Sequence, residues 1–169
     1  YNVLETAKNL NFKQVLITST SETYGSAQYT PIDEKHPMVA QSPYAASKIS
    51  ADQLSLSYFL SYDLPVKIIR PFNVYGPRQS TRAIIPTIIT QIINNFKKVQ
   101  LGNINTKRDF TYVTDICSAY LEVFKSSKLI GEIVNVGTKR QISVDELFTL
   151  IKSKLNSSVG LEQVDFRKR

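Results

Sequence analysis

Apolar residues recur at helical spacing in the first twelve positions, where Val3, Leu4, Ala7 and Leu10 fall near one face of a helix. A short β-prone apolar run follows at residues 14–18 and leads directly into a cluster of serines and threonines. This change from helical spacing to a continuous run predicts a helix and then a buried strand that ends in a polar loop.

Residues 26–41 show no sustained period and predict an irregular connection. Ser42 and Pro43 are residue types favoured at the N-cap and the first position of a helix, and the helical pattern continues to about residue 62. The rest of the chain predicts strands at 66–69, 99–101 and 132–136, a polar loop at 70–78, and helices at 84–98, 115–126 and 144–155, the last capped by Ser143.

Strands that alternate with helices are typical of βαβ units, so the pattern predicts an α/β fold with a mainly parallel, doubly wound sheet covered on both faces. Ligands of such folds bind outside the carboxyl ends of the strands. Residues 19–25 and 71–78 are polar segments that follow predicted strands, which makes them the candidate site. The sequence contains no internal repeat or linker, so it predicts one main domain and a small C-terminal lobe.

The composition is that of an ordinary globular domain, with 42% hydrophobic and 21% charged residues among 169. No apolar stretch reaches the roughly 20 residues that span a bilayer, and no secretion signal opens the sequence, so we expect a cytoplasmic protein without a membrane partner. One cysteine and one histidine exclude a disulfide scaffold and a Cys/His zinc site, and no metal site is expected. Cys117 is predicted to be a small core residue and His36 a surface residue.

The net charge of +7 raises the question of a polyanionic partner. Apart from Arg167, Lys168 and Arg169, the basic residues are scattered in singles and pairs among 14 acidic ones. The scatter favours a solvated surface with a few phosphate ligands over a nucleic-acid interface.

Tyr44 and Lys48 are four residues apart near the start of a predicted helix, so both project from one face. A nearby ammonium group favours the phenolate form of a phenol, which a tyrosine general base requires. The spacing alone is also compatible with an ordinary helix surface, and its meaning depends on the surrounding motifs.

Four segments supply that context: residues 18–25 (TSTSETYG), 42–48 (SPYAASK), 70–78 (RPFNVYGPR) and 108–113 (RDFTYV). In this order and spacing, the chain resembles the extended short-chain dehydrogenases/reductases, the sugar-nucleotide epimerases and dehydratases. The resemblance implies a Rossmann-like fold, NAD as cofactor and a nucleotide-sugar substrate.

The resemblance also implies roles for individual residues. Tyr44 would take the proton from a sugar hydroxyl while hydride passes to NAD, Thr20 would hydrogen-bond the same sugar oxygen, and Lys48 would bind the nicotinamide ribose. The full cofactor-binding set would be Ser19, Tyr44, Lys48, Pro71 and Phe72.

Asn73, Arg78 and Arg108 would bind the substrate, and arginine suits the diphosphate because its guanidinium recognises phosphate through two hydrogen bonds. Two alternatives remain at this point. Arg108 could form a surface ion pair with Asp109, and Asn73 could form a loop Asx turn.

Within the family, the triplet Thr20-Ser21-Glu22 resembles that of the GDP-mannose 4,6-dehydratases, where the glutamate removes the C5 proton. Simple 4-epimerases usually lack a glutamate here, whereas UDP-glucuronate decarboxylases share the triplet. The dTDP-glucose dehydratases carry an aspartate in place of Ser21, which leaves the acid for water loss unidentified and Ser21 as the catalytic candidate at that position.

A longer stretch, residues 40–52 and 70–91, looks most like the bacterial nucleotide-linked N-acetylglucosamine 4,6-dehydratases of legionaminic acid-type surface-sugar pathways. The sequence therefore predicts dehydration of UDP- or GDP-N-acetylglucosamine to a 4-keto-6-deoxy sugar nucleotide. The alternatives within the family are a UDP-glucuronate decarboxylase and a UDP-sugar 4-epimerase.

The six glycines are too far apart to form the Gly-rich turn that binds pyrophosphate in such folds. We therefore expect the C-terminal portion of a dinucleotide-binding domain, with segments 72–110 and 140–169 contributing to a substrate lobe. The chain alone is expected to be inactive, and a non-catalytic remnant or nucleotide-binding module is the alternative of another class. The resemblance further implies a homodimer through a helix bundle containing the helix that begins at Tyr44, although its apolar positions could equally be core: Ile49, Leu54, Leu56 and Phe59.

Overall fold

The computed structural model describes residues 1–164, so Arg167, Lys168 and Arg169 lie outside the described residues. The chain forms two compact units. Unit 1 comprises Tyr1–Val74 and Thr111–Thr138, and unit 2 comprises Tyr75–Phe110 and the residues from Lys139 onward.

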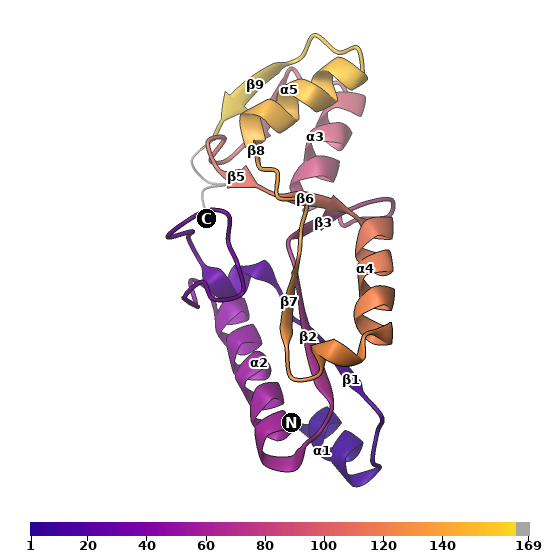
Figure 1. Cartoon of the computed structure of the whole chain (residues 1–169). Coiled ribbons are helices and arrows are strands. Elements are labelled where there is room, and N and C mark those ends of the chain that lie inside the picture. Colours follow the sequence, from indigo (N-terminus) through magenta and orange to yellow (C-terminus); the bar gives the residue numbers. More distant parts are fainter. Residues whose placement is uncertain (165–169) are drawn as a thin grey trace. The chain divides into compact units, whose positions relative to one another are not determined.

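Unit 1 is built on a three-stranded parallel sheet in the order β1-β2-β7 (Figure 1). The strands are β1 (Val15–Thr18), β2 (Val66–Pro71) and β7 (Ile133–Val136). Because all three run in the same direction, their carboxyl ends lie at one edge of the sheet. The parallel sheet predicted from the sequence is confirmed, and β2 continues two residues into the predicted loop.

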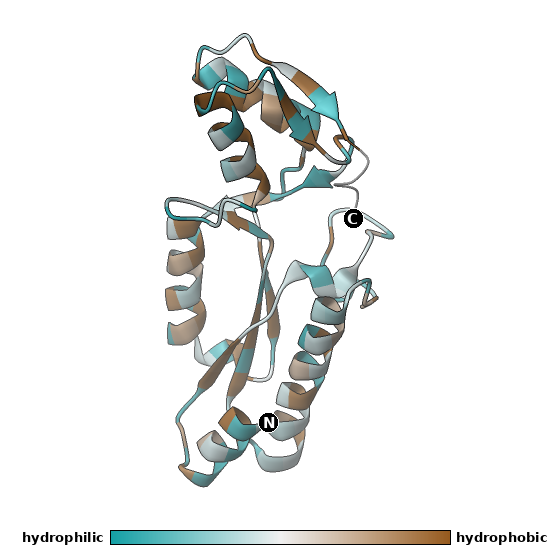
Figure 2. Ribbon diagram, turned by 180° about the vertical axis from the view of Figure 1, so that it is seen from behind, coloured by the Kyte–Doolittle hydropathy of each residue, from teal (hydrophilic) through white to brown (hydrophobic). Residues whose placement is uncertain are grey.

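Helices cover both faces of this sheet, with α2 (Pro43–Tyr62) on one side and α4 (Val113–Lys125) on the other (Figure 1). The short helix α1 (Asn2–Asn9) contacts α2. Figure 2 shows hydrophobic residues along the strands that these helices cover. The core on the α2 side contains Leu4, Ala7, Val15, Tyr58, Leu64, Val66 and Ile68. The doubly wound arrangement is thus confirmed.

The start of α2 follows the local signals in the sequence. The Ser42 hydroxyl accepts a hydrogen bond from the Ala45 amide at 3.0 Å, and Pro43 occupies the first position, where a helix needs no N–H donor. The helix ends at Asp63, which adopts a left-handed conformation with φ of 54°. These boundaries fix where Tyr44 and Lys48 project.

Unit 2 packs α3 (Ile84–Ile93) against α5 (Val144–Lys154) around a core that includes Ile88, Val99, Leu101, Leu147 and Phe148. Its strands pair as β4 (Lys98–Leu101) with β9 (Gly160–Gln163) and as β5 (Lys107–Arg108) with β8 (Ile142–Ser143). Ser143 and Glu146 form a capping box at the start of α5, which confirms Ser143 as the cap.

Four short elements complete the description. Two are the 3-10 helices η1 (Ser21–Tyr24) and η2 (Ser127–Leu129). The other two are the paired strands β3 (Asn73–Tyr75) and β6 (Phe110–Tyr112), where the chain passes from one unit to the other. The helix predicted at 84–98 ends at Ile93, and Lys98 already begins a strand.

Two single-residue predictions are wrong. His36 is buried, with 2% exposed, because its ring satisfies both nitrogens on backbone groups: Nε2 accepts from the Gln28 amide and Nδ1 contacts the Pro37 carbonyl. Cys117 is exposed. The buried positions of α4 are Ile116 and Val123, seven residues apart, so the neighbouring Cys117 is turned about 100° away from that face.

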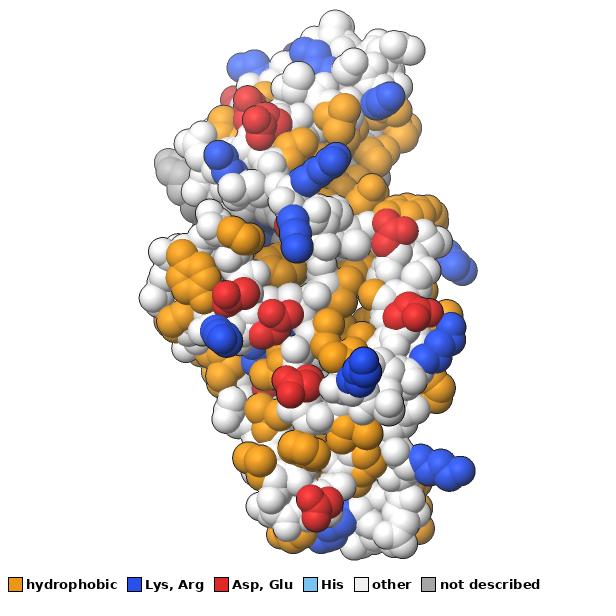
Figure 3. All heavy atoms as spheres, in the orientation of Figure 1, with side chains coloured by type: hydrophobic (Ala, Val, Ile, Leu, Met, Phe, Trp, Pro, Cys, Tyr) orange, Lys and Arg blue, Asp and Glu red, His pale blue; other side chains and the backbone are white. Residues whose placement is uncertain are grey.

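The basic residues do not all belong to a solvated surface. Lys67 and Arg70 on β2 are 2% and 1% exposed. On the face of the molecule shown in Figure 3, the remaining charged side chains of both signs are interspersed.

Candidate active site

The segment after β1 forms a tight turn at the carboxyl edge of the unit 1 sheet. Thr20 caps η1, because its hydroxyl oxygen accepts a hydrogen bond from the Glu22 amide at 3.2 Å. The turn closes at Gly25, whose φ is 64° and where an added Cβ would lie 2.6 Å from the Val39 carbonyl oxygen. Only glycine fits there, and the turn presents Thr20, Ser21 and Glu22 at the end of the strand.

Tyr44 and Lys48 stand on the first turns of α2, which contacts η1. The Lys48 ammonium donates a hydrogen bond to the Thr18 carbonyl at 2.9 Å and lies 5.9 Å from the centre of the Tyr44 ring. Tyr44 is 49% exposed, so its ring is open to a ligand. The structure therefore brings the Tyr-Lys pair to the end of β1, which carries the triplet.

Pro71, Phe72 and Asn73 occupy the end of β2 and the start of β3. The Phe72 amide donates to the Val136 carbonyl at 2.9 Å, which extends the parallel ladder to the carboxyl edge. All three side chains are half-buried. Pro71 ends the strand that pairs with β1, and Phe72 and Asn73 directly follow it, at the same edge of the sheet as the triplet.

Arg78 and Arg108 belong to unit 2, and both are exposed. Arg78 has a φ of 66°, and Arg108 lies on β5 opposite Ile142. Near Arg108, the Asp109 carboxylate accepts a hydrogen bond from the Lys139 amide at 2.8 Å.

Sequence reasoning missed a buried polar network beneath this edge. Ser19, predicted to bind the cofactor, is 3% exposed, and its hydroxyl donates to Asp52 Oδ2 at 2.8 Å. Arg70 donates to the same oxygen and also to the Tyr24 hydroxyl at 2.9 Å. Tyr24 in turn donates to Asn135 Oδ1 at 2.7 Å. The available signal was Asp52 itself, a charged residue four positions after Lys48 on the same helix.

The connection between η1 and α2 is ordered by its own hydrogen bonds. The Tyr29 hydroxyl donates to Asp33 Oδ1 at 2.7 Å, and this bond to a carboxylate raises the pKa of Tyr29 to about 12. The same bond lowers the pKa of Asp33. Glu34 accepts from the Asn135 amide at 2.8 Å, which ties the connection to β7.

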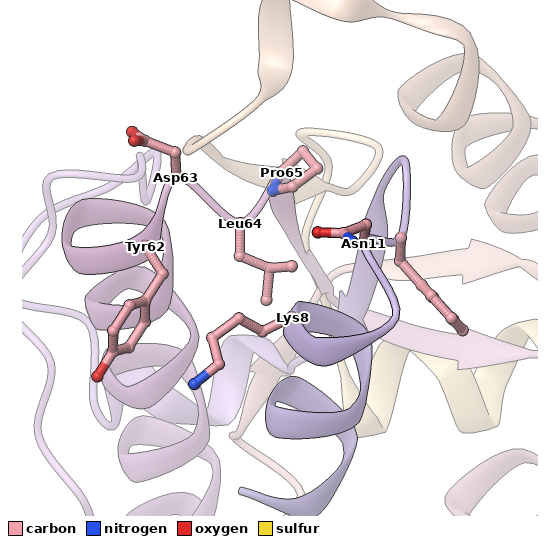
Figure 4. A pocket seen from close by; sticks show the side chains of 7 residues that line it. Lys8, Asn11, Tyr62, Asp63, Leu64 and Pro65 are labelled. Atoms are coloured by element: carbon pink, nitrogen blue, oxygen red, sulfur yellow. The ribbon is translucent and has the colours of Figure 1, made fainter.

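A separate hollow of about 200 Å³ lies at the other end of α2 (Figure 4). Its lining is Lys8, Asn11, Phe12, Tyr62, Asp63, Leu64 and Pro65. These residues border the amino ends of β1 and β2, opposite to the edge where parallel sheets bind ligands. The hollow contains none of the predicted site residues.

The fold and this edge define an α/β protein of Rossmann-like architecture with a Tyr-x-x-x-Lys pair beside a Thr-Ser-Glu turn. The sequence pattern of the family described as GDP-mannose 4,6 dehydratase matches residues 1–168. The chain belongs to this family, a group of the extended short-chain dehydrogenases/reductases, as its motifs predict.

Relatives in this family include both dehydratases and epimerases. The dTDP-D-glucose 4,6-dehydratase of Homo sapiens is 36% identical over 168 residues, which are 97% of this chain and 48% of the human protein. The chain thus spans about half the length of such curated relatives.

Two solved structures match almost the whole chain. The UDP-N-acetylglucosamine 4-epimerase of Methanobrevibacter ruminantium M1 is 32% identical, with a TM-score of 0.90 over 97% of this chain and 54% of its own. The dTDP-glucose 4,6-dehydratase of Bacillus anthracis str. Ames, solved in complex with NAD, is 34% identical, with a TM-score of 0.89 over 96% of this chain and 53% of its own. Among residues 1–164, no helix is long and apolar enough to cross a membrane.

Proposed function

We propose that the chain carries the catalytic residues of an NAD-dependent nucleotide-sugar 4,6-dehydratase, a lyase, and that its substrate is UDP- or GDP-N-acetylglucosamine. The observation that carries the proposal is the placement of the Thr20-Ser21-Glu22 turn beside the Tyr44 and Lys48 pair. Dehydration needs two bases acting at neighbouring sugar carbons, and this edge offers a phenol and a carboxylate.

The residues present fit the nicotinamide-ribose end of NAD. A lysine ammonium has three N–H donors, and among the described residues the Lys48 group uses one, on the Thr18 carbonyl, so two remain for ribose hydroxyls. Pro71 and Phe72 supply half-buried apolar surface at the carboxyl end of β2. Bound there, NAD would supply the hydride acceptor for oxidation at C4 of the sugar and the hydride donor for reduction at C6.

Tyr44 is the group that removes the proton from the C4 hydroxyl, since it is exposed at the edge and has an ammonium beside it. The Thr20 oxygen accepts from the Glu22 amide, which leaves its own O–H to donate to the same sugar oxygen. A ketone at C4 acidifies the C5 proton, and the exposed Glu22 carboxylate removes it. The C6 hydroxyl then leaves as water with the proton that Glu22 took from C5, and Ser21 is the further candidate residue for this step.

Unit 2 supplies the substrate lobe in this proposal. Arg108 and Arg78 would bind the diphosphate of the sugar nucleotide, because a guanidinium forms paired, charge-assisted hydrogen bonds to phosphate. Asn73, in unit 1, is proposed separately as a substrate-binding residue. The exposure of both arginines leaves their guanidinium groups accessible to such a ligand.

A second candidate is a UDP-sugar 4-epimerase, which the similarity to the epimerase of M. ruminantium favours. Epimerisation uses Tyr44, Lys48 and Thr20 in the same way but has no step for Glu22. A UDP-glucuronate decarboxylase would also carry the triplet. A non-catalytic nucleotide-binding module would not need all four catalytic candidates, which are Thr20, Glu22, Tyr44 and Lys48.

Product analysis tests the proposal. The native polypeptide is incubated with UDP- and GDP-N-acetylglucosamine in turn, and the products are identified by NMR. The expected product has a methyl group at C5 and a C4 ketone. UDP-glucuronate is tested in the same way as a third substrate. A C4 epimer from the first two substrates, or a pentose from UDP-glucuronate, would overturn the assignment, and no product from any of the three would support the non-catalytic module.

We also propose a homodimer through α2. Leu54, Leu56 and Phe59 pack against the core of unit 1, so they fit the alternative of ordinary core residues. Leu60 is 79% exposed near the end of α2. Light scattering on the native polypeptide and on Leu60→Lys is expected to give a dimer and a monomer; a monomer in both would contradict the proposal.

A further inference from the structure

Asp52 is buried in unit 1, and one of its oxygens accepts every hydrogen bond that the structure assigns to its carboxylate. The side chain is fully buried, and Oδ2 accepts hydrogen bonds from the Ser19 hydroxyl at 2.8 Å and from Arg70 Nε at 2.9 Å, while Arg70 Nη2 forms an ion pair with it at 2.9 Å. Among the described residues, Oδ1 has no hydrogen-bond partner. A single oxygen atom therefore joins three elements: the end of β1, the middle of α2 and the end of β2.

Ser19, Arg70 and the Asp52 carboxylate are all shielded from water, which makes the junction rigid. Ser19 and Arg70 are 3% and 1% exposed. A buried arginine next to a buried carboxylate has no solvent to replace a lost partner, so the geometry is held strongly. Arg70 extends the junction to the last residue of η1 through its bond to the Tyr24 hydroxyl at 2.9 Å.

The elements joined here are the ones that carry the reacting groups. Tyr44 and Lys48 stand on α2, and Thr20 to Glu22 directly follow Ser19. Asp52 is eight residues after Tyr44, about 12 Å along the helix axis, so the carboxylate is too far away to touch the substrate. Its effect on the reaction must pass through the elements that it holds.

We propose that Asp52 is a positioning residue that fixes the distance between the tyrosine base on α2 and the Thr-Ser-Glu turn after β1, with the Ser19 hydroxyl as the direct link. This inference rests on the proposed function for its effect on rate. Misplacement of a catalytic group by 1 Å can cost about 100-fold in rate. Loss of the hydrogen bond from Ser19 to Asp52 should therefore lower kcat strongly while the protein remains folded.

The test compares Ser19→Ala with Ser55→Ala in the native polypeptide. Ser55 is a matched control on α2: it is 1% exposed, and its hydroxyl donates to the Ala51 carbonyl within the same helix at 2.7 Å. The readout is the formation of reduced cofactor at saturating nucleotide sugar. Ser19→Ala should lower this rate by about tenfold or more with KM changed less than twofold, and Ser55→Ala should leave both unchanged.

Both variants should lower Tm by similar small amounts, about 2–4 °C. A Ser19→Ala rate within twofold of the parent, or an equal rate loss in Ser55→Ala, would overturn the inference. The double variant Asp52→Leu/Arg70→Met removes the pair without leaving a lone buried charge, so it should fold and still show the low rate. A parental rate in the double variant would also overturn it.

Dehydration and epimerisation both begin with reduction of the cofactor, before any water is lost. The rate of cofactor reduction can therefore be measured even if the protein is an epimerase and not a dehydratase. If no nucleotide sugar reduces the cofactor, the proposed function fails while hydrogen exchange still decides the positioning claim. The Thr23 and Gly25 amides donate to the Thr20 and Glu22 carbonyls. Their exchange should accelerate about tenfold in Ser19→Ala and stay unchanged in Ser55→Ala; equal exchange in both variants would refute the link.

Discussion

Two buried cations three residues apart on β2 serve opposite faces of the same sheet. The Lys67 ammonium points to α4, where it donates to the Val123 and Phe124 carbonyls and to the Gln14 side chain at 2.9 to 3.0 Å. Arg70 points to α2, where it meets the Asp52 carboxylate and the Tyr24 hydroxyl. Residues of a strand alternate between faces, so this division follows from the strand itself.

Lys67 and Arg70 differ in the hydrogen-bond acceptors that they bind. Lys67 satisfies the last carbonyls of a helix, where a positive charge is favoured by the helix dipole, and its three donors have neutral acceptors. Arg70 shares a carboxylate oxygen with Ser19 at the edge that carries the site. The comparison indicates that the buried charge of Lys67 near the amino end of β2 maintains packing, whereas the buried charge of Arg70 near its carboxyl end maintains site geometry.

The largest effect is expected from breaking the Arg70 side of the comparison. Asp52→Leu leaves the guanidinium buried without its carboxylate and should lower the free energy of unfolding by about 3–5 kcal/mol. Addition of Arg70→Met should recover most of this loss, as urea unfolding would show. If the single variant were as stable as the parent protein, the pair would have no structural role.

A smaller effect is expected from Lys67→Met. The substitution keeps an apolar stem but leaves the buried acceptors on α4 without a donor, which should cost about 1–3 kcal/mol in the same urea experiment. The rate of cofactor reduction should remain parental in the folded variant. A rate loss comparable to that of the Asp52→Leu/Arg70→Met variant would erase the distinction between the two cations.

The smallest effect is expected from a change of pH, which acts on the carboxylate of Glu5 in α1 and its hydrogen bond to Tyr58 in α2. Glu5 accepts hydrogen bonds from Lys8 and from the Tyr58 hydroxyl, and these bonds lower the pKa of Glu5 below its ordinary value of 4.5 and raise the pKa of Tyr58. Because the pKa is depressed in the folded state, the contribution of Glu5 to stability is present above 4.5 and is lost as the pH falls through the folded value.

Glu5→Gln should therefore have a lower Tm than the parent protein at pH 7, with the difference shrinking below pH 4.5. The control is Glu122→Gln, which removes only an exposed ion pair with Lys125 and should leave Tm unchanged at both pH values. A difference for Glu5→Gln that grows in acid would contradict the assigned direction of the pKa shift.

Local signals predicted much of the fold, because they act between near neighbours. Ser42 and Pro43 mark the start of α2 and Ser143 caps α5, while the two-residue strands β5 and β8 are too short to show a period. The partners of Lys67 and Arg70 come from positions 18 to 57 residues away, so a scan for local charge patterns places both cations on the surface.

In the candidate site, too, some residues could be predicted from the sequence and others could not. Spacing and motif order identified Tyr44, Lys48 and the triplet, since these residues lie close in sequence to the helix start and the strand end. Asp52 is visible in the sequence four residues after Lys48, but its partners Ser19 and Arg70 come next to it only when β1 and β2 pair. The sequence therefore shows the groups proposed to react but not those that hold them.

The most direct test of the proposed dehydratase chemistry follows deuterium from C4 of UDP- or GDP-N-acetylglucosamine through one turnover of the native polypeptide. The proposal predicts that the label appears in the C6 methyl group, that exchange with solvent occurs at C5, and that Tyr44→Phe slows label transfer by about 100-fold or more. Retention of the label at C4, with inversion there and no exchange at C5, would contradict the dehydratase assignment and show a 4-epimerase.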